Sequence, residues 1–449
     1  MISTKDLVEK VNALILADGL SDLNYTQLSN IDEFLKNSVA TVATLNDLPL
    51  ASANKGKMIF VADMKQYQHS NGVEWENIFD TTFYIKSDVY GWGENGQGHL
   101  GDNTVIDKSS PVSPVGGITN WTQITGSGYH ALALTSDGIA YAWGDALAGK
   151  LGDNSTADKS SPVTVVGGIT NWSQLSAAVN HSLGVTKNGI AYAWGFNGAG
   201  HLGDGTNFSR RSPVTVIGGI TNWSQVSAGG AHSLGIAGGI AYAWGGGFDG
   251  VLGDGTATNK TSPVTVIGGI TNWSQLSGGE FHSVGIADGI AYAWGRNVTG
   301  QVGDGTTVNK SSPVTVLGDI ANWSQVSAGD DHVVGVTEDG IAYAWGSGNF
   351  GMLGDNSTIN KSSPVTVVGG ITNWSQVNAG GFHSLGLTSD GIAYAWGAGA
   401  TGRLGNNSNV NRSSPVTPVG GIANWTQVNA ARFHSSALSV NETKGFDEA

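Results

Sequence analysis

The chain has 449 residues, a formal net charge of −14, only 12% charged residues, 69 glycines and no cysteine. This acidic balance supplies no basic field for a phosphate backbone, so we expect no nucleic-acid partner, and the missing cysteines exclude disulfides and thiolate chemistry. Charges interrupt the apolar stretch at the N-terminus and no apolar run reaches the length of a membrane span, so we expect neither a signal peptide nor membrane insertion.

Residues 1–40 predict a helical segment that is not part of any repeat. A first helix is expected over about 4–17, opened by Ser3 and ended by Gly19. A second helix is expected to begin near Asn24, again with apolar residues along one face. Two short amphipathic helices cannot form a core alone, so we expect this segment to serve in anchoring or oligomerisation.

Residues 41–80 predict a small β module. Its expected strands cover 58–62, 65–69 and 73–78, with an Asn71-Gly72 turn before the last. The module resembles one that recurs in virion proteins of tailed phages, through Leu48-Pro49, Gly56, Val61, Asp63, Tyr67, Asn71-Gly72 and Trp75. The helical pair before it is similar to the N-termini of marine phage structural proteins. These resemblances imply a component of a virus particle.

From residue 81 onward the chain is a repeat of 50–51 residues. Two tryptophan series mark it, with spacings of 51, 51, 50, 50, 51 and 51 in both. The first series precedes a glycine and comprises Trp92, Trp143, Trp194, Trp244, Trp294, Trp345 and Trp396. The second stands in an N-W-(S/T)-Q motif and comprises Trp121, Trp172, Trp223, Trp273, Trp323, Trp374 and Trp425.

Each repeat contains four short strand candidates bounded by glycine, proline or Asn/Asp turns, which is the composition of a propeller blade. The fold class is therefore all-β: a seven-bladed β-propeller of four-stranded blades over 81–440, preceded by the small α+β segment and followed by a tail over 441–449. The region begins with the later part of a repeat and ends with the earlier part. We therefore expect one blade to combine strands from both ends and to close the ring.

The repeat pattern W-G-x-N-x-x-G-x-L-G-D-G, then S-P-V, then G-x-x-H and G-I-A-Y-A-W-G, resembles the regulator-of-chromosome-condensation repeat. The resemblance implies a seven-bladed propeller. The best-known member of the family is a guanine-nucleotide exchange factor that uses a wedge-like insertion and a basic tail. Here the repeat length varies by one residue, and the first 80 residues carry six Lys/Arg against eleven Asp/Glu. Both departures argue against exchange activity.

Three polar series invite a chemical interpretation. One repeat position is always histidine: His130, His181, His232, His282, His332, His383 and His434. These histidines could suggest metal sites, but equivalent residues of different blades lie around a ring, too far apart to share a metal ion. The favoured interpretation is a hydrogen bond from each histidine to a turn backbone. An acidic residue follows the L-G position of the repeat in six copies, with Asn406 in the last copy: Asp102, Asp153, Asp204, Asp254, Asp304 and Asp355. These residues could bind Ca²⁺, but each turn supplies only one carboxylate, so capping of an Asx turn is the favoured interpretation. A basic residue precedes S-P-V in every copy: Lys108, Lys159, Arg210, Lys260, Lys310, Lys361 and Arg412. These residues could form a cationic ring, but protection of an outer edge strand is the favoured interpretation. We expect no metal, no cofactor and no catalytic residue.

Differences between the copies are the best guide to a binding site. The residue before the motif histidine varies and is the candidate binding rim: Tyr129, Asn180, Phe281, Asp331, Phe382 and Phe433, with Ala231 in the third copy. The loop after W-G also varies, for example over 94–99, 248–251 and 349–352. Variation at these positions favours either a recognition surface or drift in loops that the fold does not constrain.

The favoured function is a non-enzymatic virion structural protein, as a tail-fibre, appendage or decoration component made in the host cytoplasm. Residues 1–80 would contact other virion proteins, a homotrimer being one expectation, and the propeller would be a rigid head for a host surface receptor. The alternative is a cytoplasmic propeller scaffold or regulator that binds a protein partner. A third interpretation is an enzyme acting on surface glycans.

Overall fold

The computed structural model describes residues 40–42, 58–61, 66–70, 75–77, 83–422 and 424–444 of the chain, and side chains are discussed for 86–422 and 424–440. It divides into two units, residues 1–84 with 442–449 and residues 85–441. Within the described residues, no helix is long and apolar enough to cross a membrane.

The first unit contains one small sheet. Its strands are β1 (Ala40–Val42), β2 (Met58–Val61), β3 (Gln66–Ser70) and β4 (Trp75–Asn77), in the order β1-β2-β3-β4. β2, β3 and β4 pair antiparallel in chain order, at positions that overlap the strands predicted there. The helices predicted over 4–17 and after Asn24 lie outside the described residues.

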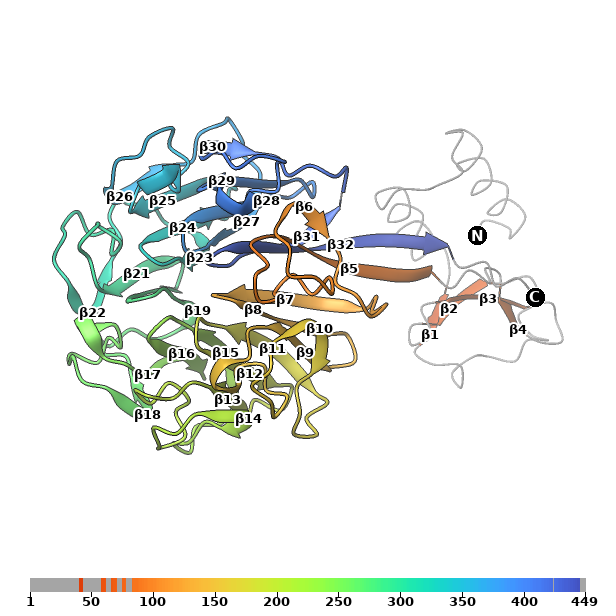
Figure 1. Ribbon diagram of the computed structural model, residues 1–449, viewed down its shortest axis with the longest axis horizontal. Helices are drawn as coiled ribbons and strands as arrows, with labels where there is room; N and C mark the ends of the chain where they lie inside the picture. The colour runs from red at the N-terminus through yellow and green to blue at the C-terminus, as the bar shows by residue number, and fades with distance from the viewer. Residues whose placement is uncertain are drawn as a thin grey trace. The chain divides into compact units, whose positions relative to one another are not determined.

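The second unit is a ring of seven four-stranded antiparallel sheets, which confirms the predicted propeller (Figure 1). The first strand of each blade is innermost, because these strands contact one another in a closed order from β7 to β31 and back to β7. The inner strands are β7 (Trp121–Ser127), β11 (Trp172–Ala177), β15 (Trp223–Ala228), β19 (Trp273–Gly278), β23 (Trp323–Ala328), β27 (Trp374–Ala379) and β31 (Trp425–Ala430). The second strands, which begin at the motif histidines, are β8 (His130–Thr135), β12 (His181–Thr186), β16 (His232–Ala237), β20 (His282–Ala287), β24 (His332–Thr337), β28 (His383–Thr388) and β32 (His434–Lys444).

The two outer strands of each blade follow the same plan. The third strands end in the W-G motif and are β5 (Phe83–Gly93), β9 (Ala140–Gly144), β13 (Ala191–Gly195), β17 (Ile240–Gly245), β21 (Ile290–Gly295), β25 (Ala342–Gly346) and β29 (Ala393–Gly397). The outermost strands carry the S-P-V proline and are β6 (Lys108–Val112), β10 (Lys159–Thr164), β14 (Arg210–Thr215), β18 (Lys260–Thr265), β22 (Lys310–Thr315), β26 (Lys361–Thr366) and β30 (Arg412–Val416). Proline is tolerated there because an edge strand needs no donor on its open side. Short 3-10 turns follow four of the W-G motifs: η3 (Leu147–Gly149), η4 (Phe248–Gly250), η5 (Asn349–Gly351) and η6 (Ala400–Gly402).

The ring closes through a blade assembled from both ends of the propeller, as predicted. Its order is β31-β32-β5-β6, so two C-terminal strands complete two N-terminal ones. The glutamine of the N-W-(S/T)-Q motif continues the closure, because its side-chain oxygen accepts the backbone N–H of the next inner strand in all seven blades. Across the seam, the Ile124 N–H donates to Gln427 Oε1 at 2.9 Å.

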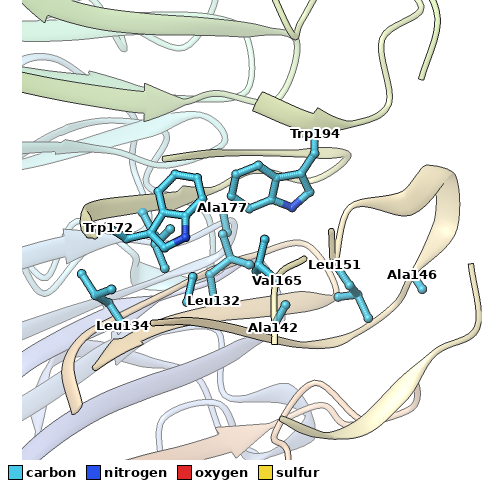
Figure 2. Packing of buried hydrophobic residues seen from close by; sticks show 11 residues of the cluster. Leu132, Leu134, Ala142, Ala146, Leu151, Val165, Trp172, Ala177 and Trp194 are labelled. Atoms are coloured by element: carbon cyan, nitrogen blue, oxygen red, sulfur yellow. The ribbon is translucent and has the colours of Figure 1, made fainter. Parts of the chain in front are cut away.

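The hydrophobic core lies between blades rather than within them. Figure 2 shows Leu132 and Ala142 of the β7–β10 blade packed with Trp172 and Trp194 of the next blade. The two indole rings lie 5.8 Å apart between centroids and are buried. Each tryptophan of the W-G series also donates its Nε1–H to a main-chain carbonyl of the preceding blade, at 2.8 to 3.0 Å. One residue type therefore supplies both the apolar area and the polar contact that join neighbouring blades.

Candidate functional site: the rim face

The motif histidines are structural, but their partner is not the one predicted. Five of them contact a serine Oγ of the following blade through Nε2, at 2.7 to 2.9 Å. The predicted bond from the ring to a turn backbone is therefore wrong for these five. The reason is that the second strand of the next blade begins with H-S, which places a hydroxyl directly against the ring, as with His181 and Ser233.

The serine contacts also define the histidine tautomer. The Ser233 hydroxyl donates its single hydrogen to the His201 carbonyl at 2.8 Å, so it can only accept from the ring. His181 therefore carries its hydrogen on Nε2. Complete burial lowers the pKa of every motif histidine well below its usual value, to about 3 for His232, His282 and His332.

Two copies lack the serine and provide matched tests. Ala131 and Val333 replace it, and the ring nitrogens of His434 and His282 that would face it have no hydrogen-bond partner among the described residues. We expect Ser233→Ala to lower the free energy of unfolding by about 1–3 kcal/mol, because a buried N–H loses its acceptor. Ala131→Ser should raise it by about 0.5–1.5 kcal/mol. Urea unfolding followed by tryptophan fluorescence measures both changes. If both variants are destabilised, or both are stabilised, the serine is not the stabilising partner of the histidine.

The acidic and basic series, treated separately in the sequence, pair with each other. Asp204 Oδ1 accepts the Thr206 N–H at 3.0 Å, which is the predicted Asx turn, and its Oδ2 pairs with Arg210 Nη2 at 2.8 Å. Five further copies pair a lysine with the aspartate at 2.9 to 3.6 Å. Each basic residue begins an outermost strand, as predicted.

The candidate rim residues lie together at one end of the strands. Each immediately precedes a second strand, and its carbonyl accepts the N–H of the residue after W-G in the same blade, as Asn180 accepts from Phe196 at 2.9 Å. The same main-chain bond occurs in all seven blades. The two sets of variable positions found in the sequence therefore share one face of the ring, which we call the rim face.

Three of the six rim residues form an aromatic arc. Tyr129 stacks on Phe433 with centroids 5.0 Å apart, Phe433 lies 5.8 Å from Phe382, and Phe382 lies 6.2 Å from Phe350 of the loop after W-G. Two guanidinium groups, of Arg403 and Arg432, lie 5.6 to 5.9 Å from the centres of the two central rings. The arc runs continuously over four blades, which sequence spacing alone could not show.

A charged cluster stands beside the arc, at the opening of the ring axis. Arg432 lies 3.0 Å from Glu280 Oε2 and 2.8 Å from Asp330 Oδ2, and so joins three blades. Burial, together with Glu280 and Asp331 nearby, raises the pKa of Asp330 to about 7 in spite of Arg432. These three residues stand two positions before the motif histidine. Sequence reasoning missed them, although that position also varies between copies.

The remaining rim residues separate into two groups. Asn180 and Phe281 line a cavity of about 430 Å³ that also includes Ala231, with Val179, Phe196, Gly198, Ala199, His201, Gly230, Phe248, Glu280 and Arg432. Asp331 lies outside this cavity, and its Oδ1 accepts from Gln301 Nε2 at 3.3 Å. The structure thus divides the predicted rim into an aromatic arc, a cavity and an acidic position between them.

The comparisons with known proteins agree with this architecture. The regulator of chromosome condensation (RCC1) repeat matches residues 86–134, 188–236, 288–336, 339–387 and 390–438, which is more than half of the chain. The ultraviolet-B receptor UVR8 of Arabidopsis thaliana is 31% identical over 344 residues, covering 75% of this chain and 67% of UVR8. The human E3 ubiquitin-protein ligase HERC2 is 30% identical over 181 residues, which span 38% of this chain but 4% of HERC2. This chain is therefore a seven-bladed propeller protein of the regulator of chromosome condensation repeat family.

Solved structures show the same fold at low sequence identity. Human WBSCR16 has a TM-score of 0.71 and 19% identity, over 79% of this chain and 98% of that one. Yeast RCC1 (Prp20), bound to Kap60, has a TM-score of 0.69 and 22% identity, over 81% of this chain and 90% of that one. A second structure is that of Prp20p from Saccharomyces cerevisiae, which was described together with the binding of Prp20p to Gsp1p and histones.

Proposed function

We propose that this chain is a partner-binding propeller, a scaffold or regulator that holds another protein on its rim face and catalyses no reaction itself. One observation carries the proposal: the repeats are nearly identical where they build blades and differ where their turns converge on one face. The core contacts described above recur from blade to blade, so packing does not require the differences. Positions that packing leaves free, gathered on one surface, are typical of recognition sites.

The chemistry of the rim face supports a protein ligand. Protein interfaces are enriched in aromatic residues and arginine, and their strongest contacts cluster near the centre. The aromatic arc and Arg432 supply these residue types around the ring axis. Phe248 and Phe350, in the loops just outside, are 53% and 48% exposed, so both side chains can contact a partner.

Relatives of the chain support the same class of function. The yeast relative Prp20 binds Kap60 in one structure, and its binding properties to Gsp1p and histones accompany another. Rim charges that are already engaged with one another, Arg432 with Glu280 and Asp330, suit a binding role better than acid–base catalysis.

A rim variant tests the proposal directly. Phe382 and Phe433 are half-buried rim residues whose side chains lie outside the inter-blade core clusters. We expect the double change Phe382→Ala with Phe433→Ala to reduce capture of the physiological partner about tenfold or more, because central aromatic residues dominate interface energies. Affinity capture with quantitative mass spectrometry, followed by a dissociation constant for the purified partner, measures the effect.

The matched control lies at the opposite end of the strands. Ile217 and Ile267 follow outermost strands there, and each is 43% exposed. Their double change to alanine should leave capture unchanged. Equal capture by the rim variant and the wild type, with both folded by circular dichroism, would exclude the rim face as the binding surface.

The virion assignment stays a prediction. It was drawn from residues 1–80, of which only four short strands are described, and none of the relatives above is a virion protein. The expected virion partners, host receptor, trimer and particle localisation depend on that same segment. Mass spectrometry of purified particles tests all of them at once, because absence of the chain from the particle would remove the assignment.

A further inference from the structure

The cavity on the rim face has apolar walls with a few polar groups among them. Phe196 and Phe248 come from loops after W-G in adjacent blades, and Phe281 comes from the rim of the next blade. Phe196 is 40% exposed and Phe248 is 53% exposed, so these walls are open to solvent. At about 430 Å³, the cavity exceeds the volume of one large side chain. It can therefore take two neighbouring side chains of a bound segment.

One of the carboxylates beside the cavity has no cationic partner among the described residues. Three carboxylates meet near the ring axis, those of Glu280, Asp330 and Asp331, and Arg432 pairs with the first two. Asp330 Oδ2 is buried and, although it lies 2.8 Å from Arg432 Nε, receives no hydrogen bond among the described residues. The chain as a whole carries −14. Asp331 forms no ion pair among the described residues, so an added cation is favoured beside it.

Two further observations favour a cation over an anion. His201 lines the cavity but is neutral at physiological pH, because burial lowers its pKa to about 4. The faces of aromatic rings attract cations, and Arg296 already lies 5.6 Å from the centre of the Phe281 ring. The phenylalanine walls thus accept both the apolar stem and the charged end of a basic side chain.

We propose, on the basis of the partner-binding function above, that this cavity takes an extended partner segment in which a large apolar residue adjoins an arginine or lysine. The apolar side chain enters between Phe196 and Phe248. The basic side chain lies at the Phe281 edge of the cavity and pairs with the carboxylate of Asp331. The aromatic arc on the other side of the axis then contacts the rest of the partner.

An array of short synthetic peptides probed with the full chain tests this inference. We expect enrichment of peptides with Arg or Lys within two positions of Phe, Leu or Trp. For the best purified peptide, Phe196→Ser with Phe248→Ser should weaken binding about tenfold or more. Asp331→Asn should weaken it about threefold to tenfold and reduce its dependence on salt.

The matched control is Ile217→Ser with Ile267→Ser, which changes two apolar side chains of similar exposure at the opposite end of the strands and should leave peptide affinity unchanged. Enrichment of acidic peptides, no enrichment at all, or affinities that ignore the cavity variants would overturn the inference. This inference can fail while the proposed function holds. If Phe382→Ala with Phe433→Ala abolishes partner capture while the cavity variants do not affect it, the rim face binds the partner and the cavity assignment is wrong.

Discussion

Lowering the pH from about 7 to about 5 is expected to unfold the propeller or bring it close to unfolding, because seven neutral histidines are completely buried in it. Each folded-state pKa lies well below the ordinary value of 6.5. The unfolded chain therefore binds protons that the folded chain cannot, and stability falls as the pH drops below about 6.5. Above that value these histidines are neutral in both states and have no effect.

The expected size follows from one pKa unit being 1.36 kcal/mol. At a pH of about 5, each motif histidine whose folded pKa lies below 5 costs about 2 kcal/mol relative to neutral pH. His232, His282 and His332, whose pKa is lowered to about 3, together cost about 6 kcal/mol. The other four, whose pKa is also lowered well below 6.5, add to this cost, which is already comparable to the stability of a typical domain. Asp330 acts in the opposite sense, because its pKa is raised to about 7 in the folded state, but it is one group against seven.

Urea unfolding at a series of pH values measures this dependence. The midpoint should be constant between about pH 7 and 8 and should fall steeply between about 6.5 and 5. The aspartates of the Asx turns do not confuse the result, because the pKa of each shifted one is lowered and they titrate below this window. A flat midpoint down to about pH 5 would show that the histidines become protonated in the folded ring.

Removal of residues 425–449 is expected to abolish the folded propeller. It deletes β31 and β32, leaves β5 and β6 without their inner neighbours, and removes Trp425 and Val428 from the core cluster around Trp92. Each large apolar side chain buried there contributes about 1.5–3 kcal/mol, and the new strand edges favour aggregation. We expect insoluble protein, or a soluble product without a cooperative thermal transition.

Two controls separate ring closure from the loss of sequence. A chain ending at Lys444 keeps both strands and should unfold at the wild-type temperature. A permuted chain in which 424–444 precede 83 by a short linker makes the closing blade continuous, and it should fold. Size-exclusion chromatography and thermal unfolding by tryptophan fluorescence measure all three. A truncated chain that retains the wild-type transition would show that the closing blade does not hold the ring together.

Almost all of the propeller fold could be predicted from the sequence, because the chain repeats the same unit seven times. The tryptophan spacings define the blade, the number of copies defines the ring, and the incomplete repeats at the two ends define the closing blade. Contacts between blades were harder to predict, because they join residues about one repeat apart whose mutual orientation depends on the ring. The bond from His181 to Ser233 is such a contact, since the H-S pair reads as one motif but its members bind different neighbours.

The candidate site was predicted in part. Variation between copies identified Tyr129 and Phe433, and the ring places them in contact. It did not identify the pair of Arg432 with Glu280, which are 152 residues apart in the sequence. Their side chains come within 3.0 Å only because the ring brings the two blades together across its axis. Pairs of this kind have no local signal. They become visible only when the blades are arranged in a circle and equivalent positions are read around it.

The main-chain bond at each rim turn has an evolutionary consequence. There the fold uses the carbonyl of the rim residue, and its half-buried side chain lies outside the core clusters, so these seven positions can mutate at a small cost in stability. Natural selection can then change the partner one blade at a time, without the loss of folding that usually accompanies new function. A library randomised at those seven positions should remain folded in most of its members, which makes this ring a ready starting point for engineered binding proteins.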